Sequence, residues 1–134
     1  MTGRSARRAP RDRGAAAVEF AIVLPVLVAL VLGIIAYGHA FHVQSVLSNA
    51  ARDAVRVVAL HQGADSAASA REAAVAAASP SITLDDSQIA ITPSTCAGGT
   101  GPRSATVTIT YPMELLGGIG DITLTGRGTM RCNG

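Results

Sequence analysis

Few residues of this 134-residue chain have the types and spacing that catalysis or metal binding requires. His39 and His42 are about one helical turn apart, a spacing that can bind a metal ion, but no carboxylate stands at the next turn. Asp85 and Asp86 are adjacent, and adjacent side chains in a turn point apart. No nucleophile is accompanied by a base and an orienting group. We therefore expect a non-enzyme without metal or cofactor, with interfacial or packing histidines and solvated aspartates.

Positive charge is concentrated in an N-terminal tail. The formal net charge is only +2, too small to indicate a nucleic-acid partner. Five arginines precede the first apolar run, opposed only by Asp12: Arg4, Arg7, Arg8, Arg11 and Arg13. With two Phe, two Tyr and no Trp, the sequence also offers little material for an aromatic core or an aromatic ligand cage.

A long apolar segment follows the tail. No charged residue occurs from Phe20 to Gly38, and counting back to Ala15 gives about 24 residues interrupted only by Glu19. As a helix this segment is about 36 Å long, enough to cross a hydrocarbon core of about 30 Å. A soluble buried helix is rarely apolar on all faces over such a length. Because the arginines flank its N-terminal end, we expect a cytoplasmic N-terminus and an exported C-terminus.

A cleaved signal peptide is the alternative for this segment. Gly38-His39-Ala40 has small residues at the two positions that signal peptidase recognises, which would place the cleavage before Phe41. However, the apolar core of a signal peptide is about 7–15 residues long, which is shorter than this run. The apolar pattern also continues at helical spacing through Phe41, Val43, Val46, Leu47, Ala50, Ala54, Val57 and Val58. We therefore predict one helix from residue 15 to about residue 60, with its first half in lipid.

Glu19 is unusual, because a carboxylate at the margin of a membrane span is costly. It could simply flank the span at the interface. However, Gly14 follows an arginine-rich leader, and Glu19 is the fifth residue after it. This segment resembles the processing motif of type IV prepilins, in which a membrane aspartyl peptidase cuts after the glycine. The resemblance implies that Ala15 becomes the first residue and that Glu19 neutralises the new amine of a neighbouring subunit, since paired charges enter lipid at lower cost.

Residues 13–59 combine several specific features: Gly14, Ala17 to Phe20, Leu24-Pro25, Gly33, Tyr37-Gly38, and Asn49-Ala50-Ala51-Arg52-Asp53 with Ala54 and Arg56. In these features the segment resembles the TadE-like family, the pseudopilins of Tad/Flp tight-adherence pilus systems. The sequence departs from the family at Ala36-Tyr37, where a Glu or Phe often precedes the glycine. The resemblance implies processing by a prepilin peptidase, and partners among other pseudopilins and the inner-membrane pilus assembly platform. Major pilins of these systems are much shorter, which favours a minor role.

Small residues recur at four-residue steps along the span, at Ala17, Ala21, Pro25, Ala29 and Gly33. Small residues at this spacing let helix backbones approach closely in lipid. We expect this stripe to be a helix-packing face, with plain lipid exposure as the alternative. Pro25 should kink the helix or leave the Ala21 carbonyl unpaired.

The remainder of the chain changes period. A second helix is expected from about Asp65 to Ala78, with Asp65 or Ser66 as N-cap and Ser79-Pro80 as its end. After Pro80, apolar residues alternate with polar ones, which predicts a three-stranded antiparallel sheet packed on the helices. The inward-facing set is Ile89, Ile91, Val107, Ile109, Tyr111, Ile122, Leu124, Met130 and Cys132.

Cys96 and Cys132 are the only cysteines, and both fall on the exported side. In an oxidising compartment an even pair indicates a disulfide. Closing the 35 intervening residues would stabilise the domain by on the order of 3–4 kcal/mol. Two free thiols are the alternative.

These observations predict an α+β chain in four parts. They are an Arg-rich leader over residues 1–14, a transmembrane helix over 15–38, a periplasmic continuation over 39–61 and a small exported α+β domain over 62–134. We expect a minor pseudopilin in the bacterial cytoplasmic membrane, with incorporation into a surface pilus left open. The alternative is an uncut or signal-peptidase-cleaved surface or secreted protein that binds a partner unrelated to pilus assembly.

Overall fold

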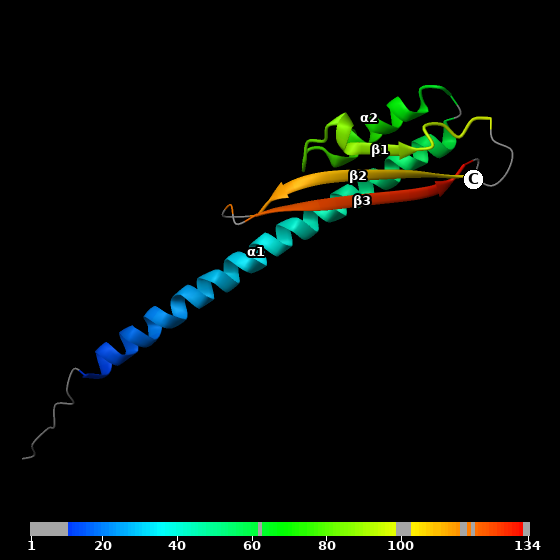
Figure 1. Cartoon of the computed structure of the whole chain (residues 1–134). Coiled ribbons are helices and arrows are strands. Elements are labelled where there is room, and N and C mark those ends of the chain that lie inside the picture. Colours follow the sequence, from blue (N-terminus) through cyan, green and yellow to red (C-terminus); the bar gives the residue numbers. More distant parts are fainter. Residues whose placement is uncertain (1–10, 62, 99–102, 116–117, 119, 133–134) are drawn as a thin grey trace, which may run out of the picture. The chain divides into compact units, whose positions relative to one another are not determined.

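The computed structural model describes residues 11–61, 63–98, 103–115, 118 and 120–132. In chain order the elements are α1 (Arg11–Leu60), α2 (Ser66–Ala78), a short 3-10 helix η1 (Asp86–Gln88), β1 (Ile89–Thr92), β2 (Ser104–Glu114) and β3 (Asp121–Arg131) (Figure 1). This confirms the predicted α+β class, with a long apolar helix, a short helix and a small antiparallel sheet. The chain divides into two structural units after Ile35, and α1 contributes to both.

The first unit contains the early part of α1. The helix begins at Arg11, so the predicted start near Ala15 was four residues too late. Arginine and alanine are good helix formers, which favours this earlier start. The helix continues through Pro25.

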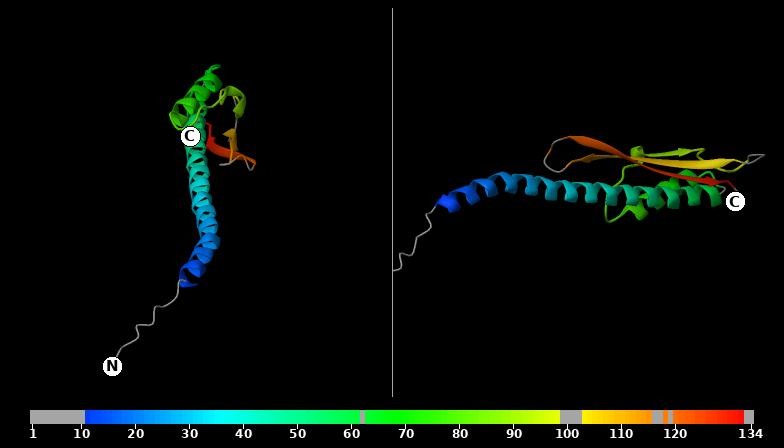
Figure 2. Two further views of the ribbon diagram at one scale, coloured as in Figure 1. Left: turned by 90° about the vertical axis from the view of Figure 1, so that its left-hand side faces the viewer. Right: turned by 90° about the horizontal axis from the view of Figure 1, so that it is seen from below.

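The second unit contains the sheet, in the order β1-β2-β3, with both pairs antiparallel. β2 and β3 form one long hairpin that is paired from Ser104↔Arg131 to Glu114↔Asp121. β1 pairs only with residues 106–109 of β2. The right-hand view of Figure 2 shows β2 and β3 running along the later part of α1. Side chains of β2 alternate as predicted, with Val107 and Ile109 buried on the α1 side and threonines on the other face. Met130 of β3, predicted to face inward, is exposed instead.

The two open edges of the sheet are blocked in different ways. Beyond the end of β1, the edge of β2 carries Pro112, which has no N–H to offer a further strand. On the outer edge of β3, the Gln44 side chain of α1 donates from Nε2 to the Thr125 carbonyl oxygen at 2.8 Å. The proline and the side-chain hydrogen bond each make it less favourable for another strand to pair with this sheet.

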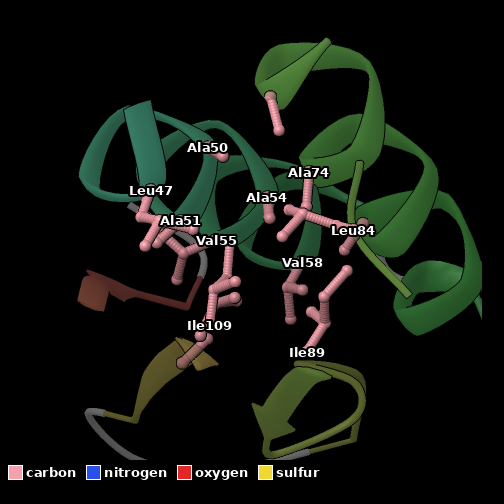
Figure 3. Close-up of a cluster of buried hydrophobic side chains, with 14 of the residues drawn as sticks. Leu47, Ala50, Ala51, Ala54, Val55, Val58, Ala74, Leu84, Ile89 and Ile109 are labelled. Carbon is pink, nitrogen blue, oxygen red and sulfur yellow. The ribbon is translucent and has the colours of Figure 1, made fainter. Parts of the chain in front are cut away.

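The core of the second unit lies between residues 43–59 of α1, α2 and the sheet. Its largest fully buried apolar side chains are Leu47, Ile109, Val43, Val58 and Val107. Figure 3 shows Ala54 of α1 and Ala74 of α2 pointing toward one another, and both are completely buried. α2 buries one residue per turn, at Ser66, Ala70, Ala74 and Ala78. Small side chains at this spacing allow two helices to pack closely.

The start of α2 differs from the prediction in its capping. Asp65 occupies the N-cap position, but its side chain makes no capping hydrogen bond. Ser66 is buried instead, and its Oγ donates to the Ser94 carbonyl oxygen at 2.9 Å. This bond satisfies a buried hydroxyl and ties α2 to the segment that follows β1.

Two glycines bring β3 into direct contact with the α1 backbone. A Cβ added at Gly126 would lie 2.5 Å from the Leu47 carbonyl carbon, and one added at Gly128 would lie 2.7 Å from that of Ala51. Atoms at such distances overlap, so no larger residue fits at either position without separating the strand from the helix. The pair also fixes the direction of the packing: advancing two residues along β3 advances four residues along α1.

Candidate functional site

The candidate processing residues lie at the start of α1. Gly14 is exposed and lies inside the helix, near its first turn, rather than before it. No atom lies within 4 Å of a Cβ built at this glycine. Glu19 is exposed and stands four residues after Ala15, so the two residues share one face of the helix. Cleavage after Gly14 would therefore create an amine one helical turn before the Glu19 carboxylate.

The apolar surface that follows is uncovered within its own unit. The large side chains from Val18 to Ile35 are all exposed, for example Phe20 at 64% and Ile34 at 64%. One helical stretch, Gly14–Leu60, is long and apolar enough to cross a membrane; its most apolar window has a mean hydropathy of 2.8, and none of that window is buried. A core helix of a soluble protein would be covered instead. The small-residue stripe Ala17, Ala21, Pro25, Ala29 and Gly33 is exposed as well.

The residues considered for metal binding or catalysis are not brought together. His39 and His42 are exposed on α1. Asp85 has a structural contact, since its backbone N–H donates to Gln88 Oε1 at 2.9 Å across η1. Within the described part of the chain, no three His, Cys, Asp or Glu residues gather in a group that could hold a metal ion.

The two cysteines are brought together. Cys96 and Cys132 form a disulfide with a Cα–Cα distance of 5.4 Å, which confirms the predicted pairing. Cys96 is buried and follows β1, and Cys132 directly follows β3. The backbone N–H of Cys132 also donates to the Arg103 carbonyl oxygen at 2.8 Å, which extends the β2–β3 ladder. The disulfide thus joins the C-terminal end of β3, one edge strand of the sheet, to the segment that follows β1, the other edge strand.

Sequence reasoning did not identify two pairs of like charges on the second unit. Arg52 and Arg56 are exposed one turn apart on α1, and Glu114 faces Asp121 across the end of the β2–β3 hairpin. The arginines were noted only for their family resemblance. Whether Glu114 and Asp121 face each other depends on the strand register, which the sequence does not state. Their positions on either side of an apolar, glycine-rich loop did indicate the turn of a hairpin.

Comparison with known proteins gives one family. The family model described as TadE-like protein matches residues 14–56, which begin at the candidate cleavage glycine and end within the second half of α1. No curated protein and no solved structure matches the chain. The match points to a protein associated with the Tad pilus. The match covers about a third of the chain, so what it shows is a TadE-like segment at residues 14–56.

Proposed function

We propose that this protein is a minor pseudopilin that supports assembly of a Tad/Flp-type pilus as a structural, non-catalytic subunit. The observation that carries the proposal is the coincidence of three features at one point of the chain. The TadE-like match begins at Gly14, the exposed apolar helix follows at once, and Glu19 stands one turn beyond Ala15. A minor role fits a chain in which the family segment is followed by a second helix and a disulfide-linked sheet.

In this proposal a prepilin peptidase removes residues 1–14, and the partners are related pseudopilins and the inner-membrane assembly platform. The arginine-rich leader favours a cytoplasmic N-terminus, so the sheet domain lies on the exported side. The disulfide agrees with this placement, because such bonds persist in oxidising compartments. After cleavage, Glu19 would lie close to the new N-terminus of α1, where the helix dipole favours a negative charge.

Cleavage by signal peptidase before Phe41 fits the structure less well. α1 is continuous through this position, and Ala40 packs against the core of the second unit. Val43 and Leu47, just beyond, are buried beneath the sheet. The bond before Phe41 thus lies at the edge of a packed domain, whereas the bond after Gly14 lies in a stretch whose side chains are exposed.

Substitution at exposed glycines of α1 tests the processing step. Gly14→Leu should leave the chain at full length on an immunoblot of cell membranes and should fail to restore pili to cells that lack the protein. Gly38→Leu is the matched control for shortening, because this glycine also has no atom within 4 Å of a built Cβ and lies away from both the cleavage point and the small-residue stripe. Normal shortening of the Gly14→Leu chain would contradict the proposal, as would normal piliation without the protein.

A further inference from the structure

The second unit carries two pairs of like charges that are exposed on its surface. Arg52 and Arg56 are exposed on the face of α1 that neither the sheet nor α2 covers. Glu114 and Asp121 are exposed at the hairpin end of the sheet. All four side chains are therefore accessible to a partner.

The acidic pair is held in place by the strand register. Glu114 and Asp121 are direct cross-strand partners at the last position of the hairpin. Their neighbours Met113 and Ile122 face α1, so the two carboxylates lie on the outer face. Like charges placed directly opposite repel one another, which disfavours this arrangement in the isolated chain. A neighbouring positive charge would remove that repulsion.

The basic pair has the spacing to meet the acidic pair. Residues four apart on a helix have Cβ atoms about 6 Å apart, and residues directly opposite on antiparallel strands have Cβ atoms about 5 Å apart. Two side-by-side ion pairs can therefore form between one such surface and the other. Arginine is well suited to this role, because its guanidinium can grip a carboxylate with two hydrogen bonds.

Within one chain the two pairs cannot meet, because they lie at different levels along α1. Gly126 lies against Leu47 and Gly128 against Ala51, so β3 runs in the same direction as α1. Asp121 is five strand residues before Gly126, while Arg52 and Arg56 lie beyond Leu47 on the helix. Their levels differ by about 25 Å at the usual rise per residue of strand and helix.

We propose that Arg52 and Arg56 of one copy bind Glu114 and Asp121 of a second copy that is displaced along the helix axis by about 25 Å. The occupant is a second copy because one chain carries both halves of the contact, with opposite charge and matching spacing. Such a contact joins different surfaces of the two copies, so it does not close into a symmetric dimer. It rests on the proposed function, since two copies anchored at the same depth must be displaced by an assembly step before they meet in this way.

Site-specific photo-crosslinking of the full chain in piliated cells tests this contact. A photoreactive residue at Thr123, exposed on the same outer face as Asp121, should crosslink to residues 49–56 of a second copy. A photoreactive residue at the exposed Asn49 should crosslink to the β2–β3 hairpin. Crosslinks from Thr123 to another hairpin, to a different protein, or to nothing would each overturn the proposal.

Charge reversal provides the second arm of the experiment. R52E/R56E and E114R/D121R should each lower the crosslink yield by about twofold to thirtyfold, the range expected for losing two exposed ion pairs. Combining all four substitutions in one chain should restore it. The matched controls R127E/R131E and E72R/D86R change the same charges at other exposed sites and should leave the yield unchanged.

The outcomes separate this proposal from the proposed function. If chains are shortened at Gly14 and are needed for pili, yet the four-charge variant does not recover its crosslink, the contact is wrong and the pseudopilin role stands. If chains are neither shortened nor needed for pili, the proposed function fails, and this contact fails with it. Retention of the Cys96–Cys132 disulfide in each variant shows that the sheet domain has folded.

Discussion

The close approach of β3 to α1 yields a prediction about stability. Whether Gly126→Ala lowers or raises Tm shows whether the strand packs directly on the helix backbone. Gly126→Ala adds a Cβ that would lie 2.5 Å from the Leu47 carbonyl carbon and 2.8 Å from the Leu47 Cβ. The first neighbour is helix backbone, which cannot rotate away. The strand must therefore move outward by on the order of 1 Å to reach ordinary contact distance, or the helix must bend.

The magnitude follows from two opposing effects. Alanine in a strand interior is intrinsically better than glycine by about 0.5–1 kcal/mol, because glycine loses more backbone freedom on folding. Overpacking of a well-filled site costs about 1–3 kcal/mol, and backbone neighbours place this site at the upper end. We expect a net loss of about 2 kcal/mol, which lowers the Tm of a domain of this size by roughly 8–16 °C.

Circular dichroism of the full chain in detergent, followed through thermal unfolding, measures this effect. Gly63→Ala is the matched control, since a Cβ there meets only the Asp65 backbone nitrogen at 3.9 Å, an ordinary contact. The control should leave Tm unchanged within about 2 °C. An unchanged or raised Tm for Gly126→Ala would refute the close packing of β3 on α1, because relief of glycine's entropy cost would then be the only effect present.

Three further predictions concern the disulfide, a buried hydroxyl and the charged start of the helix. Replacing Cys96 and Cys132 by serine should lower the stability of the sheet domain by about 3–4 kcal/mol in thermal unfolding, whereas a Tm equal to that of the oxidised parent would mean that the bond constrains nothing. Ser66→Ala removes the donor to the Ser94 carbonyl oxygen and should cost about 1 kcal/mol; the exposed Ser81→Ala control should be neutral, and equal Tm values for the two variants would contradict the role of this bond. Glu19→Ala should leave membrane insertion intact, because it removes a charge from the margin of the span, but should reduce recruitment into the pilus assembly; normal piliation in that variant would count against Glu19 as a partner of the new amine.

Much of the fold could be predicted from the sequence because its signals are local. The apolar run and the helical spacing of Val43, Leu47, Ala50 and Ala54 indicated one long helix, and the alternation around Val107 and Ile109 indicated strands with one buried face. The even number of cysteines indicated the disulfide. Each of these patterns depends on residues close together in the chain, or on a count that needs no three-dimensional register.

The features that were missed depend on register between distant segments. Gly126 and Gly128 alternate within a strand pattern, and glycine inside a strand is a sign of close backbone approach, but the sequence does not say which backbone approaches. The facing of Glu114 and Asp121 likewise follows only from the strand pairing. The early start of α1 was missed because the charged leader was treated as separate from the helix, although arginine is a good helix former.

The alanines of the TadE-like segment acquire a physical explanation from the fold. Ala50, Ala51 and Ala54 are completely buried, where they allow α2 and β3 to approach α1 closely. Asn49, Arg52 and Arg56, in the same segment, are exposed. The segment therefore combines positions that build the domain with positions that remain open to a partner.

The central claim is that the chain is processed as a prepilin, and the most direct test is the intact mass of the protein recovered from cell membranes. The account predicts the mass of a chain that begins at Ala15 and contains an intact disulfide between Cys96 and Cys132. A chain that begins at Phe41 would contradict it in favour of signal-peptidase cleavage, and a full-length chain beginning at Met1 would show that the leader is not removed.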